Sequence, residues 1–210
     1  MKRIMVFCIL LCMIMFASCA PKSNYSVEEF ESEYSSNIAP GLSEYEKNRD
    51  IEFFDITPDD IRDKIGCQIF KDGTWASAYV VYKDEMYLIS ESYGGLGIVD
   101  MELCDYNNDG QADIIYSTSW GSGIHRWEIG LFDFTTMTDN VIFSSFAEDS
   151  ALQTYMHDIC FEKTENNEFD IYTIKMPEED TINFAKLQYT KDKLIGKIIN
   201  EKNMPEILLN

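Results

Sequence analysis

Short runs of β-branched and aromatic residues, separated by turn-forming residues, fill most of the chain after Gly66. Residues 97–104 show the pattern most clearly, because Val99, Met101 and Leu103 alternate there with Asp100, Glu102 and Cys104. A period of two predicts a β-strand with one buried face and one face that is wet or binds a ligand.

The same texture predicts ten strands in all. They cover residues 74–82, 86–90, 97–104, 112–118, 124–134, 140–146, 154–162, 168–175, 181–190 and 193–199. Short connections imply antiparallel neighbours, and no long helical pattern separates the strands as a parallel α/β fold would require. We therefore expect a mainly β fold, arranged as an antiparallel meander or as two packed sheets.

One or two short helices are expected before the strands. Ser26 and Glu29 have the spacing of a capping box, which predicts a helix start. Thr57 and Pro58 predict the N-cap and the first turn of a second helix, which Gly66 should end.

The amino terminus has the pattern of an export signal. Lys2 and Arg3 precede an uncharged apolar run over residues 4–16. This run is shorter than the ~20 apolar residues needed to span a bilayer, but it fits the apolar region of a secretory signal. Residues 1–18 are therefore expected to be a signal peptide.

The sequence Ala17-Ser18-Cys19-Ala20 resembles the lipobox of bacterial lipoproteins. The resemblance implies a lipid on Cys19, with palmitate-type acyl chains, that anchors the chain stably to the cell membrane or the outer membrane. The folded part would then lie outside the cytoplasm. An ordinary cleaved signal beside a chance cysteine is the alternative.

The rest of the chain divides into two parts. Residues 19–50 are polar and acidic and are expected to form a lipid-anchored tether. Residues 51–210 are long enough for a single β-rich domain with its own core.

Charge and cysteine usage narrow the classes of partner. The chain has 37 Asp and Glu against 17 Lys and Arg, a formal net charge of −20. This balance argues against a nucleic-acid partner, because such binding depends on Lys and Arg at phosphates. Cys67, Cys104 and Cys160 follow the expected lipid anchor and allow one disulfide at most. With only two His in the chain, a zinc site is not expected.

One loop carries recognisable chemistry. Residues 105–113 read D-x-N-x-D-G-x-x-D. Calcium takes about 6–8 oxygen ligands, and side chains at alternate positions of a tight loop can supply them. Gly110 permits the sharp turn. The expected ligands are the side chains of Asp105, Asn107, Asp109 and Asp113 and the backbone carbonyl of Gln111.

An EF-hand would require Glu at the twelfth position, where Tyr116 stands inside an expected strand. The segment 97–118 instead resembles the calcium loop of FG-GAP and VCBS repeats, the modules of integrin-alpha-type propellers. The resemblance implies one structural calcium ion between two strands. Only one good copy is present, whereas propellers need about 4–8 blades, so we expect a partial, propeller-like fold. The alternative is a plain Asn-Asp-Gly turn held by Asx hydrogen bonds.

A glycine-rich segment after this loop offers a candidate ligand surface. It consists of Trp120, His125, Arg126 and Trp127. Aromatic rings could stack on a glycan or a peptide, and Arg126 could pair with a carboxylate. A glycine hairpin whose Trp residues pack into the core is the alternative.

No catalytic motif identifies an enzyme. The sequence therefore favours a membrane-anchored binding or interaction module for a glycan, a peptide or a protein. An envelope hydrolase that uses acidic residues and a purely structural envelope protein are the other two hypotheses.

Overall fold

The computed structural model describes residues 24–37, 51–92, 94–121, 126–144, 158–164, 168–174, 182–190 and 193–198. The expected signal peptide and Cys19 lie outside these ranges. Within them, no helix has both the length and the apolar character needed to cross a membrane.

The described residues form twelve strands in three four-stranded antiparallel sheets, each a meander in chain order. Sheet A contains β1 (Phe53–Asp55), β2 (Gln68–Asp72), β3 (Ala78–Tyr82) and β4 (Glu85–Ser90). Sheet B contains β5 (Gly97–Cys104), β6 (Asp113–Trp120), β7 (Arg126–Asp133) and β8 (Thr138–Ser144). Sheet C contains β9 (Asp158–Lys163), β10 (Phe169–Ile174), β11 (Ile182–Thr190) and β12 (Lys193–Ile198). The expected mainly β, antiparallel fold is confirmed, with three sheets and with β1 and β2 in addition to the ten predicted strands.

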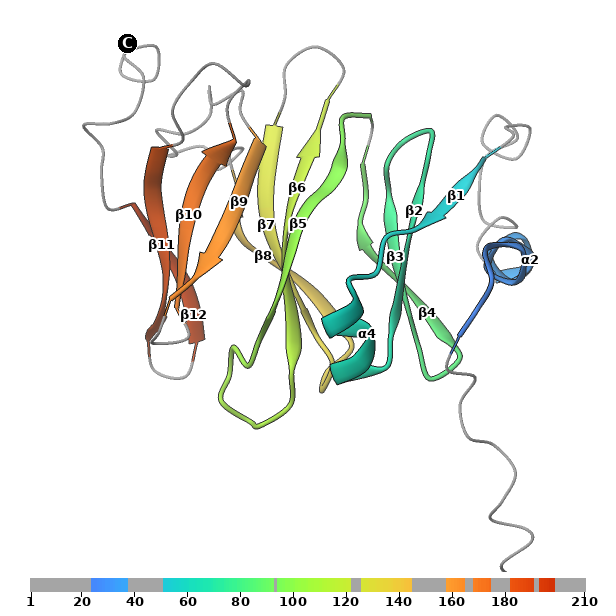
Figure 1. The fold of residues 1–210 in the computed structure, drawn as a ribbon, viewed down its shortest axis with the longest axis horizontal. Helices are drawn as coiled ribbons and strands as arrows, with labels where there is room; N and C mark the ends of the chain where they lie inside the picture. Colours follow the sequence, from blue (N-terminus) through green and yellow to red (C-terminus); the bar gives the residue numbers. More distant parts are fainter. Residues whose placement is uncertain are drawn as a thin grey trace, which may run out of the picture.

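The three sheets stack face to face in the order A, B, C (Figure 1). Apolar residues of sheets A and B meet in one core, which includes Ile69, Val80, Ile89, Ile114, Tyr116 and Phe132. A second core joins sheets B and C and includes Ile115, Ile129, Leu131, Ile159, Phe161 and Phe169. The described sheets do not close into a barrel, and their stacking matches the partial, propeller-like arrangement expected from the sequence.

Strand β6, in the central sheet, buries side chains on both of its faces. Ile114 packs toward sheet A and Ile115 toward sheet C, since neighbouring residues of a strand face opposite sides. Both faces of β6 are therefore buried. In β5, Met101 and Leu103 likewise face sheet A, whereas Cys104 faces sheet C. The predicted alternation is confirmed from Asp100 to Cys104, but a β-bulge between Ile98 and Asp100 interrupts it at Val99, so Ile98 also faces sheet A.

Helix α2 (Val27–Asn37) starts at the predicted capping box. The backbone N–H of Ser26 donates to Glu29 Oε2 at 2.9 Å, and the N–H of Glu29 donates to Ser26 Oγ at 3.2 Å. Phe30 is fully buried and stacks on Phe70 with ring centroids 4.2 Å apart. The described part of the expected tether thus includes a helix that covers the outer face of sheet A (Figure 1).

Helix α4 (Asp59–Ile65) ends as predicted at Gly66, which adopts a left-handed φ of 77°. The predicted N-cap is wrong, because Pro58 takes that position without a side-chain hydrogen bond. The hydroxyl of Thr57 instead donates to Asp55 Oδ1 at 2.6 Å and accepts the N–H of Ile69 at 2.7 Å. It therefore connects the start of the helix to sheet A. The three cysteines of the domain are free thiols.

Candidate functional site

The expected calcium loop connects β5 to β6 at one end of sheet B (Figure 1). Two of its residues adopt left-handed backbone angles, Asn108 with φ 57° and Gly110 with φ 84°. A Cβ at Gly110 would meet no atom within 4 Å, so the backbone angle alone favours glycine there. The tight turn predicted at Gly110 is confirmed.

Side-chain oxygens of the loop accept its backbone amides. Asp105 Oδ1 accepts the N–H of Asp109 and Oδ2 accepts that of Gly110, both at 3.0 Å. Asn107 Oδ1 also accepts the N–H of Asp109, at 2.9 Å. Asp109 Oδ1 accepts the N–H of Gln111 at 2.7 Å, which holds the pKa of Asp109 below its usual value. These bonds bring Asp105, Asn107 and Asp109 together around one turn.

Asp113 differs from the other carboxylates of the loop because it is fully buried, with 0% of its surface exposed. Its Oδ1 accepts the N–H of Phe134 at 3.0 Å, while Oδ2 meets no hydrogen-bond partner among the described residues. Burial raises the pKa of Asp113 to about 7, and the charges of Asp133 and Asp109 add to the effect. A buried carboxylate in this state favours a proton or a cation at its open oxygen.

A second turn, between β7 and β8, docks onto the loop. The hydroxyl of Thr135 donates to Asp109 Oδ2 at 2.8 Å, and the hydroxyl of Tyr106 donates to Asp133 Oδ2 at 2.8 Å. Asp133 Oδ1 in turn accepts the N–H of Thr135 at 2.7 Å. The sequence pattern of the loop does not point to Asp133 and Thr135, which lie 20 and 22 residues beyond the motif. Their only local signal is the turn chemistry of Asp followed by Thr.

The oxygen donors of the loop are of the types that calcium binds, but they are not already arranged around one metal position. The described residues contain no group of three or more His, Cys, Asp or Glu side chains that could hold a metal ion. The loop instead offers carboxylate, amide and backbone oxygens, the ligands that calcium accepts. The Asx hydrogen bonds of the plain turn are present as well. Only the open oxygen of Asp113 goes beyond what such a turn requires.

The described residues of the candidate ligand surface do not lie together on one surface of the fold. Trp127 is 1% exposed and stacks on Phe143 in the core between sheets B and C, with ring centroids 5.5 Å apart. Including it in a ligand surface was wrong, and the alternative of a core Trp holds for this residue. Trp120 is half-buried and lies opposite Arg126 in the pairing of β6 with β7. His125 lies outside the described residues.

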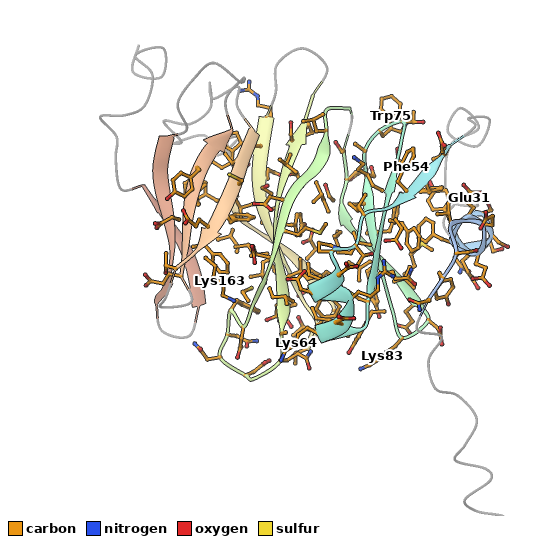
Figure 2. All side chains as sticks on the ribbon, in the orientation of Figure 1. Glu31, Phe54, Lys64, Trp75, Lys83 and Lys163 are labelled. Atoms are coloured by element: carbon orange, nitrogen blue, oxygen red, sulfur yellow. The ribbon has the colours of Figure 1, made fainter. Side chains whose placement is uncertain are left out.

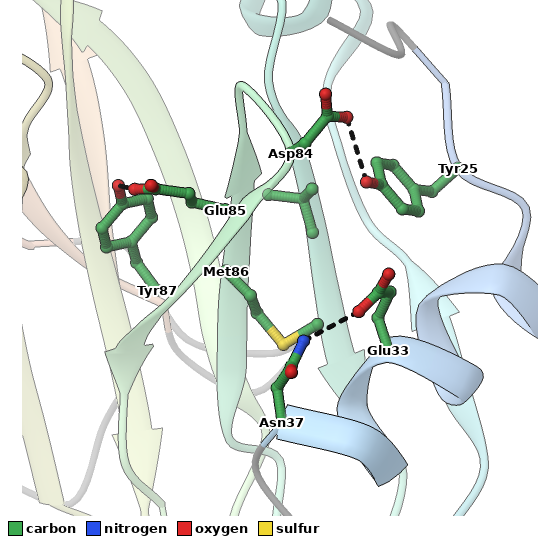
Figure 3. Close-up of a pocket in the computed structure, with 8 residues that line it drawn as sticks. Tyr25, Glu33, Asn37, Asp84, Glu85, Met86 and Tyr87 are labelled. Carbon is green, nitrogen blue, oxygen red and sulfur yellow. Dashed lines mark hydrogen bonds between the residues drawn. The ribbon is translucent and has the colours of Figure 1, made fainter.

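Several pockets are lined by described residues of the sheets. One of about 330 Å³ lies between β4 and sheet B, and Trp120 lines it. A second, of about 700 Å³, lies beside the calcium loop between α4 and β9, with Lys64 and Lys163 in its wall (Figure 2). A third, of about 390 Å³, lies between α2 and β4 (Figure 3). Tyr25 donates its hydroxyl to Asp84 Oδ1 there, at 3.0 Å.

No protein-family model, curated protein or solved structure matches this chain. The case for a function therefore depends on the residues and their geometry.

Proposed function

We propose that the chain is an exported lipoprotein, anchored through Cys19, whose β-domain is stabilised by one calcium ion and serves as a binding or interaction module. The observation that carries the metal site is the open, buried Oδ2 of Asp113 at the end of the acidic loop. The anchor is supported by the amino-terminal sequence alone.

The carboxylate of Asp113 is buried away from water. A carboxylate that is buried without a partner costs free energy, unless a proton or a cation neutralises it. Asp109 and Asp133 place further negative charge nearby, which makes a cation the more favourable partner near neutral pH. A divalent ion would neutralise several of these carboxylates at once.

The residues that would hold the ion are the side chains of Asp105, Asn107, Asp109 and Asp113, with the carbonyl of Gln111. Asp109 also accepts the hydroxyl of Thr135, so the same residue belongs to both turns at this end of sheet B. An ion held there would stiffen the β5–β6 hairpin and its contact with the β7–β8 turn. Its role is structural, and no catalytic group of the loop is involved.

A hydrolase remains a second candidate, and one observation favours it. Asp139 and Glu128 line the pocket that contains Trp120, and burial raises the pKa of Asp139 to about 6. An acidic group with a raised pKa in a pocket is a feature of general-acid catalysis. The absence of a catalytic motif in the sequence leads us to prefer binding.

The test is thermal melting of the lipid-anchored chain, purified in a non-ionic detergent, in 10 mM calcium, in 10 mM magnesium and in EDTA. If the dissociation constant lies at ~10⁻⁴–10⁻³ M, calcium should raise the melting temperature by about 3–10 °C. The Asp109→Ala variant should lose this rise. Asp63→Ala removes an exposed carboxylate from α4, close to the loop but outside it, and should keep the rise. Equal melting in calcium and EDTA would reduce the loop to a hairpin turn.

A further inference from the structure

The pocket between sheets A and B has a wall on each side. Ile89, Ser90 and Glu91 contribute from β4 and the residue after it, while β6, β7 and β8 contribute the opposite wall. Its volume of about 330 Å³ is at the small end of the usual range for ligand pockets. That size suits a small ligand or one group of a larger ligand.

The charge of the lining is of one sign. Glu91, Glu128 and Asp139 line the pocket, and its described lining includes no Lys or Arg. Glu128 is half-buried and accepts the hydroxyl of Ser144 at 2.7 Å. Asp139 is exposed as a residue, but its carboxyl accepts the hydroxyl of the buried Tyr116 at 2.5 Å. Burial raises the pKa of Asp139 to about 6, and the charge of Glu128 adds to this effect. The pocket is therefore anionic at neutral pH and carries mutual repulsion that a cation would relieve.

Aromatic and apolar surface accompanies these carboxylates. Trp120 lines the pocket and is only half-buried, in contrast to Trp127 in the core. The face of an indole ring attracts cations, most strongly where water is excluded. Val141 is 56% exposed and Ile89 is buried, and both line the pocket. They would offer contact surface to methyl or methylene groups.

The wall is fixed in place by the fold. The hydroxyl of Tyr116 lies within hydrogen-bond distance of both the carbonyl of Ile89 in sheet A and the carboxyl of Asp139 in sheet B, and its one proton is shared between them. Its ring can lie there because the opposite residue of β7 is Gly130, where a Cβ would approach the ring to 2.1 Å. The position of the Asp139 carboxyl is thus set by a buried group that bridges two sheets.

We propose that this pocket binds an organic cation, namely an amine or a quaternary ammonium group carried by a small ligand. The positive charge would face Glu128 and Asp139, and the indole of Trp120 would cover its apolar substituents. An anionic ligand would be repelled, and a neutral ligand would gain the apolar contact without the charge. The pocket shares no residue with the calcium loop, so this site is separate from the metal site proposed above.

The test is a calorimetric titration of the lipid-anchored chain in non-ionic detergent, with EDTA present so that the calcium loop plays no part. The probes are choline and 3,3-dimethylbutanol, a neutral molecule of the same shape. Choline should bind, and the neutral molecule should bind at least about tenfold more weakly. A cation–π contact of ordinary strength predicts that Trp120→Leu weakens choline binding by about twofold to thirtyfold.

Two further variants separate a specific site from damage to the fold. Glu128→Gln keeps an acceptor for Ser144 but removes the charge, so it should also weaken choline binding several-fold. Trp75→Phe changes a Trp in the β2–β3 connection that does not line the pocket, and it should leave the affinity unchanged (Figure 2). The proposal would be overturned if the natural chain did not bind choline, or if it bound the neutral molecule as tightly as choline. It would also be overturned if Trp120→Leu and Glu128→Gln both bound choline as tightly as the natural chain does.

Discussion

The phenol ring of Tyr116 lies against Gly130, its direct partner across the β6–β7 pairing. A Cβ at position 130 would come within 2.1 Å of the ring carbon that carries the hydroxyl and within 2.3 Å of the hydroxyl oxygen. Tyr116 is 3% exposed and hydrogen-bonded to Ile89 and Asp139, so a shift of its ring would break these contacts. The glycine is therefore required by packing rather than by its backbone angles.

Gly130→Ala should accordingly destabilise the domain. Overpacking of a buried site costs ~1–3 kcal/mol, which denaturant unfolding at equilibrium would resolve. The matched comparison is the same substitution in a Tyr116→Leu background, where the smaller side chain should remove most of the cost. An equal loss in both backgrounds would show that the Tyr116–Gly130 contact is not the cause.

Helix α2 is expected to contribute to the stability of the folded domain. Phe30 is fully buried against Phe53, Phe70 and Tyr79, so Phe30→Ala should cost ~3–5 kcal/mol in denaturant unfolding. Glu31→Ala, on the same helix, is the control and should change stability little. If Phe30→Ala had no effect, residues 27–37 would behave as part of the tether.

Asp139 should make stability depend on pH in a defined direction. Its pKa of about 6 in the folded protein exceeds the usual value of 3.8, so the folded state binds this proton more tightly than the unfolded state does. The group therefore adds stability as the pH falls from 7.5 toward 4.5. Asp139→Asn keeps an acceptor for Tyr116 and does not titrate.

The expected result is a higher melting temperature for Asp139→Asn than for the natural chain at pH 7.5, with the difference shrinking toward pH 4.5. Glu128 faces the same pocket and is present in both proteins, as is Asp55, whose hydrogen bonds lower its pKa despite burial. The effect of Asp139 is therefore obtained from the difference in melting temperature between the two proteins. A difference that stays constant across this range would contradict the raised pKa.

The lipid anchor predicts a covalent modification at one residue. Cells fed radioactive palmitate should label the natural chain, and Cys19→Ser should abolish the label. Cys67→Ser changes a buried thiol of the folded domain and should leave the labelling intact. Persistent labelling of Cys19→Ser would place the lipid elsewhere or remove the lipobox interpretation.

The sequence predicts those features that depend on neighbouring residues. The capping box of Ser26 and Glu29, the left-handed Gly66 and the turn at Gly110 all follow from local chemistry. β1 and β2 were not predicted, and β1 has only three residues. A short strand becomes regular mainly through pairing with distant partners, which a local pattern does not reveal.

In the candidate sites, too, the sequence reveals what neighbouring residues determine but not what distant contacts determine. The loop from Asp105 to Asp113 was found because its residues are contiguous. Thr135 reaches it only through the β7–β8 turn, and Asp139 reaches the pocket only through Tyr116. Trp120 and Trp127 look alike in the sequence, but they lie seven residues apart on different strands, one lining a pocket and the other filling a core.

The central claim, that the loop holds one calcium ion, is tested most directly by counting bound calcium. Equilibrium dialysis against radioactive calcium at 1 mM should be run on the natural chain, on Asp113→Asn, and on Asp63→Asn as a control for diffuse binding to an acidic surface. At a dissociation constant of ~10⁻⁴–10⁻³ M, we expect the natural chain and Asp63→Asn to bind about 0.5–0.9 ion per chain more than Asp113→Asn. Equal binding by all three proteins would contradict the account, because the buried carboxylate of Asp113 would then hold no ion.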